Sequence, residues 1–254
     1  MLAVTDHDTL DGVPEALAAG AALGVRVVPG VELSVRAPSG SMHLLGYFPG
    51  PRPEPLAQRL TGLRAARAER AERIVGRLAA LGAPVSMADV ASRAAGPIGR
   101  PHIADALVAA GYARDRQDAF ERYLADGGPA TVPHQGLEPE EAIRLVTFSG
   151  GAAVLAHPAS LRMEPRPLAA FVRRLRDMGL AGIEVHRPDH TPERRGTLAD
   201  LARRAGLVAC GGSDFHRPEE PLRPGDTGDP PLPPDTIDRL LTVGPTVPSA
   251  SVDA

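Results

Sequence analysis

Short apolar runs alternate with longer amphipathic segments along most of the chain, which is typical of α/β proteins. Six runs are predicted to be strands, at residues 2–5, 25–28, 42–48, 152–156, 182–186 and 207–210. Five helices are predicted around them, at residues 14–23, 138–149, 167–178, 192–205 and 237–241. Because strands and helices interleave, the pattern favours a parallel sheet, with functional residues at the carboxyl ends of its strands.

One predicted strand departs from the parallel pattern. Residues 42–48 follow the turn Pro38-Ser39-Gly40, so they are predicted to pair with residues 33–36 as a hairpin. If this hairpin crosses the rim of the sheet, it brings His43 to the functional edge although His43 lies within its own strand.

No strand pattern occurs between Pro49 and Pro133. A long helix is predicted at residues 56–81, and its arginine-rich face is interpreted as a solvated surface with local ion pairs. Shorter helices are predicted at residues 87–94, 100–110 and 115–126. We therefore expect three parts, a first sheet part (1–50), a helical insertion (51–135) and a second sheet part (136–254).

Composition narrows the range of functions. The net charge of −3 argues against binding of duplex DNA, whereas a small anionic substrate needs only a local basic pocket. The single cysteine excludes an internal disulfide framework and suits a reducing compartment. No apolar stretch reaches transmembrane length, so we expect a cytoplasmic protein without a membrane partner. The sequence implies no protein partner.

The segment from residue 207 to residue 216 indicates a metal site. An apolar strand ends in two glycines, and Asp214 and His216 follow two residues apart. In extended backbone such residues point to the same side, so one carboxylate and one imidazole can face the same ion. The alternative is that Asp214 only caps a turn or a helix.

Four further candidate ligands lie beside or within predicted strands: His7, Glu32, His43 and His157. A buried histidine can also simply satisfy a backbone carbonyl group, and this alternative holds for each residue taken singly. Together with Asp214 and His216, however, six such residues gather at corresponding positions of the strands. Imidazole and carboxylate ligands without a thiolate suit Zn, Mn or Fe.

Several motifs resemble those of the PHP (polymerase and histidinol phosphatase) domain family in their order and spacing, over nearly the whole chain. They are Thr5-Asp6-His7-Asp8-Thr9-Leu10-Asp11-Gly12, Pro29-Gly30-Val31-Glu32, His43-Leu44-Leu45-Gly46-Tyr47, Ala156-His157-Pro158 and Gly211-Gly212-Ser213-Asp214-Phe215-His216.

The resemblance implies a distorted (β/α)7 barrel with up to three divalent metal ions, often Mn, that hydrolyses phosphomonoesters by attack of a metal-bound hydroxide. By position, Glu32, His43 and His157 would hold one metal. His7 and His216 would contribute to a second metal. Glu32 and Asp214 would bridge to a third.

The predicted insertion carries Gly99-Arg100-Pro101-His102 and Val132-Pro133-His134. These motifs resemble a subgroup that acts on nucleoside 3',5'-bisphosphates and on the 5' ends of short RNAs. The resemblance implies that Arg100, His102 and His134 line the substrate side, where a guanidinium suits a phosphate. The alternative for Arg100 and His102 is packing at a helix start. His186 and His190 receive no role from the resemblance.

The chain departs from the family at its start. Family members begin with a strand carrying Asp-Leu-His-x-His-Ser, whose histidines bind metal. We therefore expect an N-terminally incomplete barrel and an impaired chain. The leading interpretation is a metal-dependent phosphoesterase for nucleoside 3',5'-bisphosphates, short RNA or both. The alternatives are a phosphatase for another small ester such as histidinol phosphate, and a truncated, non-catalytic relic.

Overall fold

The computed structural model describes residues 1–49, 54–94, 96–133, 136–216 and 222–243. Contacts divide the chain into two compact units. We call residues 1–58 with 137–254 the sheet unit, and residues 59–136 the helical unit.

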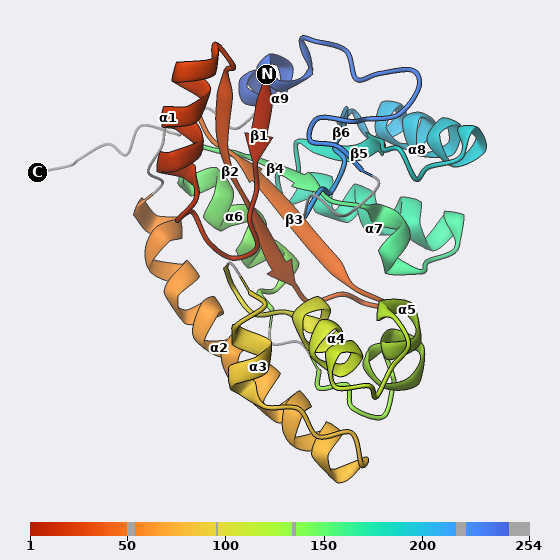
Figure 1. Cartoon of the computed structure of the whole chain (residues 1–254). Coiled ribbons are helices and arrows are strands. Elements are labelled where there is room, and N and C mark those ends of the chain that lie inside the picture. The colour runs from red at the N-terminus through yellow and green to blue at the C-terminus, as the bar shows by residue number, and fades with distance from the viewer. Residues whose placement is uncertain (50–53, 95, 134–135, 217–221, 244–254) are drawn as a thin grey trace, which may run out of the picture. The chain divides into compact units, whose positions relative to one another are not determined.

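Among its described residues, the sheet unit contains six strands that neighbour one another in chain order (Figure 1). They are β1 (Leu2–Val4), β2 (Val27–Val35), β3 (Met42–Tyr47), β4 (Ala152–Leu155), β5 (Gly182–His186) and β6 (Val208–Gly211). The pairs β1/β2, β4/β5 and β5/β6 are parallel, whereas β3 runs antiparallel to both of its neighbours. The α/β class and the hairpin are confirmed, and the sheet is mixed instead of wholly parallel. A closed barrel stays a prediction.

Strand β2 is longer than the sequence predicts. The sequence indicates a strand at residues 25–28 and a separate pairing segment at 33–36, because Pro29-Gly30 is a common turn signal. In the structure one continuous strand, β2, runs from Val27 to Val35 and covers both segments except residues 25, 26 and 36. Pairing with β1 at Pro29 and with β3 at Gly30 keeps this dipeptide extended. A side chain at Gly30 would also collide with the Gly46 carbonyl oxygen, 2.9 Å from an ideal Cβ.

Helices cover the sheet within the same unit. They are α1 (Val13–Leu23), α6 (Pro139–Phe148), α7 (Pro165–Asp177), α8 (Pro192–Ala205), α9 (Thr236–Val243) and a 3-10 turn (Pro158–Leu161). Helix α6 contacts β2, β3 and β4, and α9 contacts β4 and β6. Leu240 of α9 joins a core cluster with Leu45, Tyr47, Val154 and Val208, so α9 covers the sheet face on which these residues lie.

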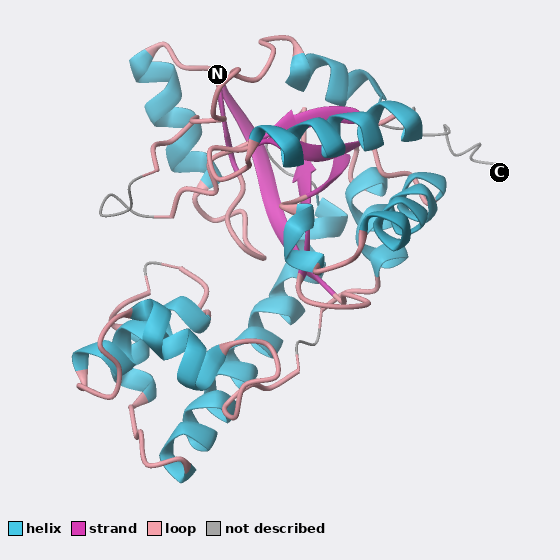
Figure 2. Cartoon of the chain, turned by 90° about the vertical axis from the view of Figure 1, so that its right-hand side faces the viewer, coloured by secondary structure: helices cyan, strands magenta, loops and turns pink. Residues whose placement is uncertain are grey.

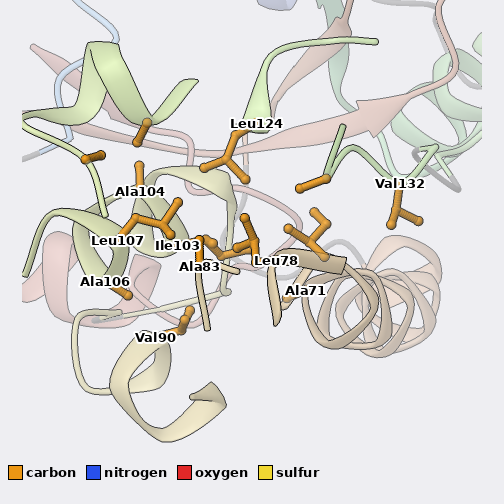
Figure 3. Packing of buried hydrophobic residues seen from close by; sticks show 14 residues of the cluster. Ala71, Leu78, Ala83, Val90, Ile103, Ala104, Ala106, Leu107, Leu124 and Val132 are labelled. Atoms are coloured by element: carbon orange, nitrogen blue, oxygen red, sulfur yellow. The ribbon is translucent and has the colours of Figure 1, made fainter. Parts of the chain in front are cut away.

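The helical unit has no strand among its described residues (Figure 2). It holds most of α2 (Glu54–Ala80), together with α3 (Met87–Ala91), α4 (Arg100–Ala109), α5 (Arg116–Ala119) and a π-helical turn (Phe120–Leu124). Its core is aliphatic and includes the buried side chains of Leu78, Ile103, Leu107 and Leu124 (Figure 3). The solvated-face interpretation of α2 is wrong at Arg70, whose partly buried Nε donates to the Val132 carbonyl oxygen at 2.8 Å.

Among the described helices, none is both long and apolar enough to span a bilayer.

Gly211 is expected to resist substitution because the neighbouring strand passes very close to it. An ideal Cβ at Gly211 would lie 1.8 Å from the His186 carbonyl oxygen, which is backbone and cannot rotate away. We expect Gly211→Ala to lower the free energy of unfolding by about 1–3 kcal/mol, measured by urea denaturation. Gly196→Ala is the control, because its Cβ would meet no atom within 4 Å. An equal loss in both variants would contradict the steric explanation.

Candidate metal centre

A cavity of about 790 Å³ lies within the sheet unit. It is bounded by residues of β1 and β6 and by the segment from Pro224 to Leu240. Five of the six predicted metal ligands line it: His7, Glu32, His157, Asp214 and His216. The structure therefore gathers side chains that are far apart in the sequence around one cavity.

The hairpin explains how His43 reaches the other candidates. Because β3 is antiparallel, its first residues lie beside the carboxyl-terminal half of β2, and His43 pairs with Ser34. Alternation along β3 then places His43 on the same face as Leu45 and Tyr47. The predicted position of Glu32 after a strand is wrong, since Glu32 lies inside β2, opposite Leu45. It still reaches the cavity because its side chain points to that face.

Two histidines converge on one oxygen of Glu32. His43 Nδ1 lies 2.7 Å and His157 Nε2 lies 3.0 Å from Glu32 Oε1. The same two nitrogens are 3.1 Å apart. The Glu32 side chain is only 7% exposed, so this carboxylate is shielded from water. Ligand atoms that share one ion, at metal–ligand bonds of about 2.0–2.2 Å, gather in a similar way.

His7 is positioned by backbone pairing next to Glu32. The Asp8 N–H donates to the Glu32 carbonyl oxygen at 2.9 Å, and the Glu32 N–H donates to the Asp6 carbonyl oxygen at 3.0 Å. His7 Nδ1 then lies 3.9 Å from Glu32 Oε2. One ligand atom from each of His7, Glu32 and His43 fits within 4.8 Å, so these three residues could hold a metal ion.

The histidines decide the charge state of Glu32. Burial alone would raise the pKa of its carboxyl group, but His7, His43 and His157 together hold that pKa well below its usual range. For His157, burial works against protonation, yet the hydrogen bond and the charge of Glu32 raise its pKa to about 9. The carboxylate is therefore a stable anion at neutral pH, as a cation ligand must be.

Asp214 and His216 line the same cavity and are more exposed than Glu32, with 31% and 47% of their side chains accessible. The His216 ring centroid is 5.9 Å from that of His7, and His216 Nδ1 contacts the Asp214 carbonyl oxygen at 2.7 Å. The Asp214 backbone is left-handed, with φ 54°, and so is that of His157, with φ 23°. The structure thus places the six predicted ligands in a tight group of four and an adjacent, more open pair.

Besides the predicted ligands and Asp6, which belongs to the first quoted motif, two further charged residues line this cavity: Glu184 and Arg187, for which the sequence predicts no role. Glu184 Oε2 accepts the backbone N–H of His157 at 2.6 Å and lies 3.4 Å from Arg187 Nη1. A glutamate in a buried apolar strand was the available signal. Of the histidines without a predicted role, His190 contacts the Val185 carbonyl oxygen through Nδ1 at 2.9 Å.

The helical unit contains two of the three predicted substrate residues among its described positions. Arg100 Nη1 donates to Asp126 Oδ1 at 2.7 Å and to the Leu124 carbonyl oxygen at 3.0 Å. His102 Nδ1 accepts the Gly99 backbone N–H at 3.0 Å, which caps the start of α4. His134 lies outside the described residues.

Comparison with known proteins links this geometry to phosphate-ester hydrolysis. No protein-family model matches the chain. A 3',5'-nucleoside bisphosphate phosphatase from Chromobacterium violaceum is 36% identical over 222 residues, which cover 87% of this chain and 78% of that protein. The 5'-3' exoribonuclease Rnm from Escherichia coli is 34% identical over 221 residues, covering 85% and 75%. A structure from Bifidobacterium adolescentis, described as a metal-dependent phosphoesterase, aligns with a TM-score of 0.81 at 33% identity, over 96% of this chain and 86% of that one.

Proposed function

The chain belongs to the family of phosphate-ester hydrolases that includes the nucleoside bisphosphate phosphatase and the Rnm exoribonuclease, and on this premise we propose its substrate and its metal ligands. We propose that it removes the 3'-phosphate of nucleoside 3',5'-bisphosphates, trims short RNA from the 5' end, or does both. The convergence of His43 and His157 on the buried Glu32 carboxylate carries the proposal, together with the family.

The residues present fit a divalent metal. Glu32, His43 and His157 are proposed to hold one ion, and His7, with His216 and Asp214, to complete a centre of up to three ions with Glu32 as a shared ligand. When bound, such ions lower the pKa of water and neutralise charge on a phosphoryl group. Manganese is the proposed metal, and zinc and iron suit the same ligands.

The chain's own residues supply positioning. Ser34 donates to Asp8 through its hydroxyl at 2.7 Å and through its backbone N–H at 2.9 Å, which fixes the turn after His7. The Ser160 hydroxyl lies 2.9 Å from His157 Nδ1, and this contact orients the ring so that Nε2 faces Glu32. Histidine ligands are commonly held in this way through their second ring nitrogen.

The substrate role of Arg100, His102 and His134 stays a prediction. The assignment of residues 51–135 to a substrate-side insertion stays a prediction as well. A phosphate would have to compete with Asp126 for the Arg100 guanidinium. Arg100→Gln is therefore a useful probe in a substrate assay.

A substrate panel tests the proposed function. The purified full chain, supplied with Mn²⁺, is incubated with adenosine 3',5'-bisphosphate, short 5'-phosphorylated RNA, histidinol phosphate and adenosine 5'-monophosphate. We expect phosphate release from the bisphosphate, nucleotide release from the RNA, or both, and no turnover of histidinol phosphate. Turnover of histidinol phosphate alone would instead favour a phosphatase for another small phosphate ester. A chain inert toward all four, with or without metal, would favour the relic.

The affinity for metal is expected to rise with pH. In the metal-free protein the pKa of His157 is raised to about 9, so His157 is protonated at neutral pH and must lose its proton to bind a cation. The interaction of protonated His157 with Glu32 stabilises the metal-free fold. This stabilisation is fully present below pH 6.5 and is lost as pH rises through about 9. We expect Mn²⁺ affinity to increase about tenfold per pH unit from neutrality to this pKa. Calorimetry in two buffers of different ionisation enthalpy measures the released proton, and an affinity independent of pH would contradict the expectation.

A further inference from the structure

A buried arginine lies beside the candidate ligands. Arg187 directly follows β5, and its side chain is only 7% exposed. Among the described residues that line the cavity, it is the only lysine or arginine. A buried guanidinium needs compensating charge, so the groups around it indicate its role.

Three carboxylates surround this guanidinium. Asp189 takes two of its donors, with Nε to Oδ1 at 2.9 Å and Nη2 to Oδ2 at 3.3 Å. Nη1 lies 3.4 Å from Glu184 Oε2, and Nη2 lies 3.5 Å from Asp214 Oδ2. Since the guanidinium is planar and rigid, it fixes the directions in which these carboxylates lie.

Through Glu184, Arg187 is linked to His157, one of the four closely spaced candidate ligands. The Glu184 side chain is 5% exposed, and its Oε2 accepts the backbone N–H of His157. His157 has a left-handed backbone at this point, so the bond holds a conformation that the residue would not adopt freely. Arg187 therefore touches Asp214 directly and is one carboxylate away from His157.

We infer that Arg187 is a positioning residue of the metal centre, which sets the Asp214 carboxylate and, through Glu184, the backbone of His157. The inference rests on the proposed metal ligands. In this arrangement one side chain links the strand ends of β4, β5 and β6. Its Nε, Nη1 and Nη2 all face carboxylates, so Arg187 acts on the ligands and not on the phosphate.

Two substitutions test this role. Arg187→Met keeps much of the side chain's length but removes its charge and donors, and Arg187→Lys keeps the charge without the planar fork. We expect Arg187→Met to weaken Mn²⁺ binding by about 10–100-fold, the usual effect of losing a contact that supports a metal ligand. Arg187→Lys should recover part of this loss. If Arg187→Met does not fold, Arg187→Lys carries the test.

Arg176→Met is the matched control. It makes the same chemical change at an arginine whose side chain is 58% exposed, pairs with Asp177 and is not part of the cavity lining. We expect its Mn²⁺ affinity to equal that of the wild type. Unchanged affinity in folded Arg187→Met would overturn the inference. So would a raised KM at unchanged metal affinity, the signature of a phosphate-binding arginine.

A measurement on metal-free protein separates this inference from the proposed function. With ¹⁵N-histidine labelling, the eight histidine amides can be followed by NMR. We expect the His157 amide signal to shift in Arg187→Met and to stay in place in Arg176→Met. A shift in a chain that binds no Mn²⁺ would reject the proposed function and retain the positioning of His157. If the His157 amide signal does not shift in Arg187→Met, the inference that Arg187 positions His157 is wrong.

Discussion

Glu32→Gln is expected to lower kcat/KM for phosphate release by more than the ~100-fold that loss of a supporting contact typically costs. The amide keeps the size of the side chain but not its charge. Both His43 and His157 face one oxygen of this carboxylate, and a neutral amide is a much weaker ligand for a cation in that place. Enzyme assay with Mn²⁺, together with metal content by mass spectrometry, measures the effect.

Glu138→Gln is the control for this substitution. The Glu138 side chain is 60% exposed and pairs with Arg36 at 2.8 Å. Exposed ion pairs contribute little, so activity and metal content should match the wild type. Full metal content and activity in Glu32→Gln would remove Glu32 from the proposed centre.

Leu107→Ala is expected to give the largest loss of stability, about 2–5 kcal/mol. Leu107 is completely buried in the core of the helical unit, where it lies near Ile103 (Figure 3). Truncation leaves a cavity that the surrounding side chains can fill only in part. Chemical denaturation followed by circular dichroism reports the change, because this unit is helical.

Leu81→Ala makes the same chemical change on the surface of the same unit. Leu81 is 45% exposed, so its truncation should cost no more than about 0.5 kcal/mol. If both leucine variants lost equal stability, the loss would reflect helix propensity or the unfolded chain and not packing at Leu107.

Hydrophobic periodicity predicts most elements of this fold, and the discrepancies arise where tertiary contacts override local signals. Pro29-Gly30 reads locally as a turn, yet it stays extended because strands flank it on both sides. Residues 115–126 read as one helix, yet the structure has a short α-helix that continues into a π-helical turn. Periodicity alone does not specify to which backbone carbonyl group each amide N–H donates its hydrogen bond.

The candidate site divides in the same way. His7, Glu32, His43 and His157 could be selected from the sequence because polar residues in or after apolar strands are conspicuous. The same signal marks Glu184, but the contacts that Glu184 and Arg187 make with these ligands could not be predicted. Glu184 meets His157, and Arg187 meets Asp214, each across 27 residues of sequence. Such contacts depend on which strands become neighbours, and no local pattern carries that information.

The left-handed backbone at His157 and Asp214 has a consequence for engineering. Each non-glycine residue in this conformation costs of order 1–3 kcal/mol, which glycine would largely avoid. Selection for thermostability alone would therefore tend to accept glycine at both positions, and the two proposed metal ligands would be lost. Stability and chemistry compete at these two positions, so a library for a hardier variant of this chain should hold both residues fixed and diversify elsewhere.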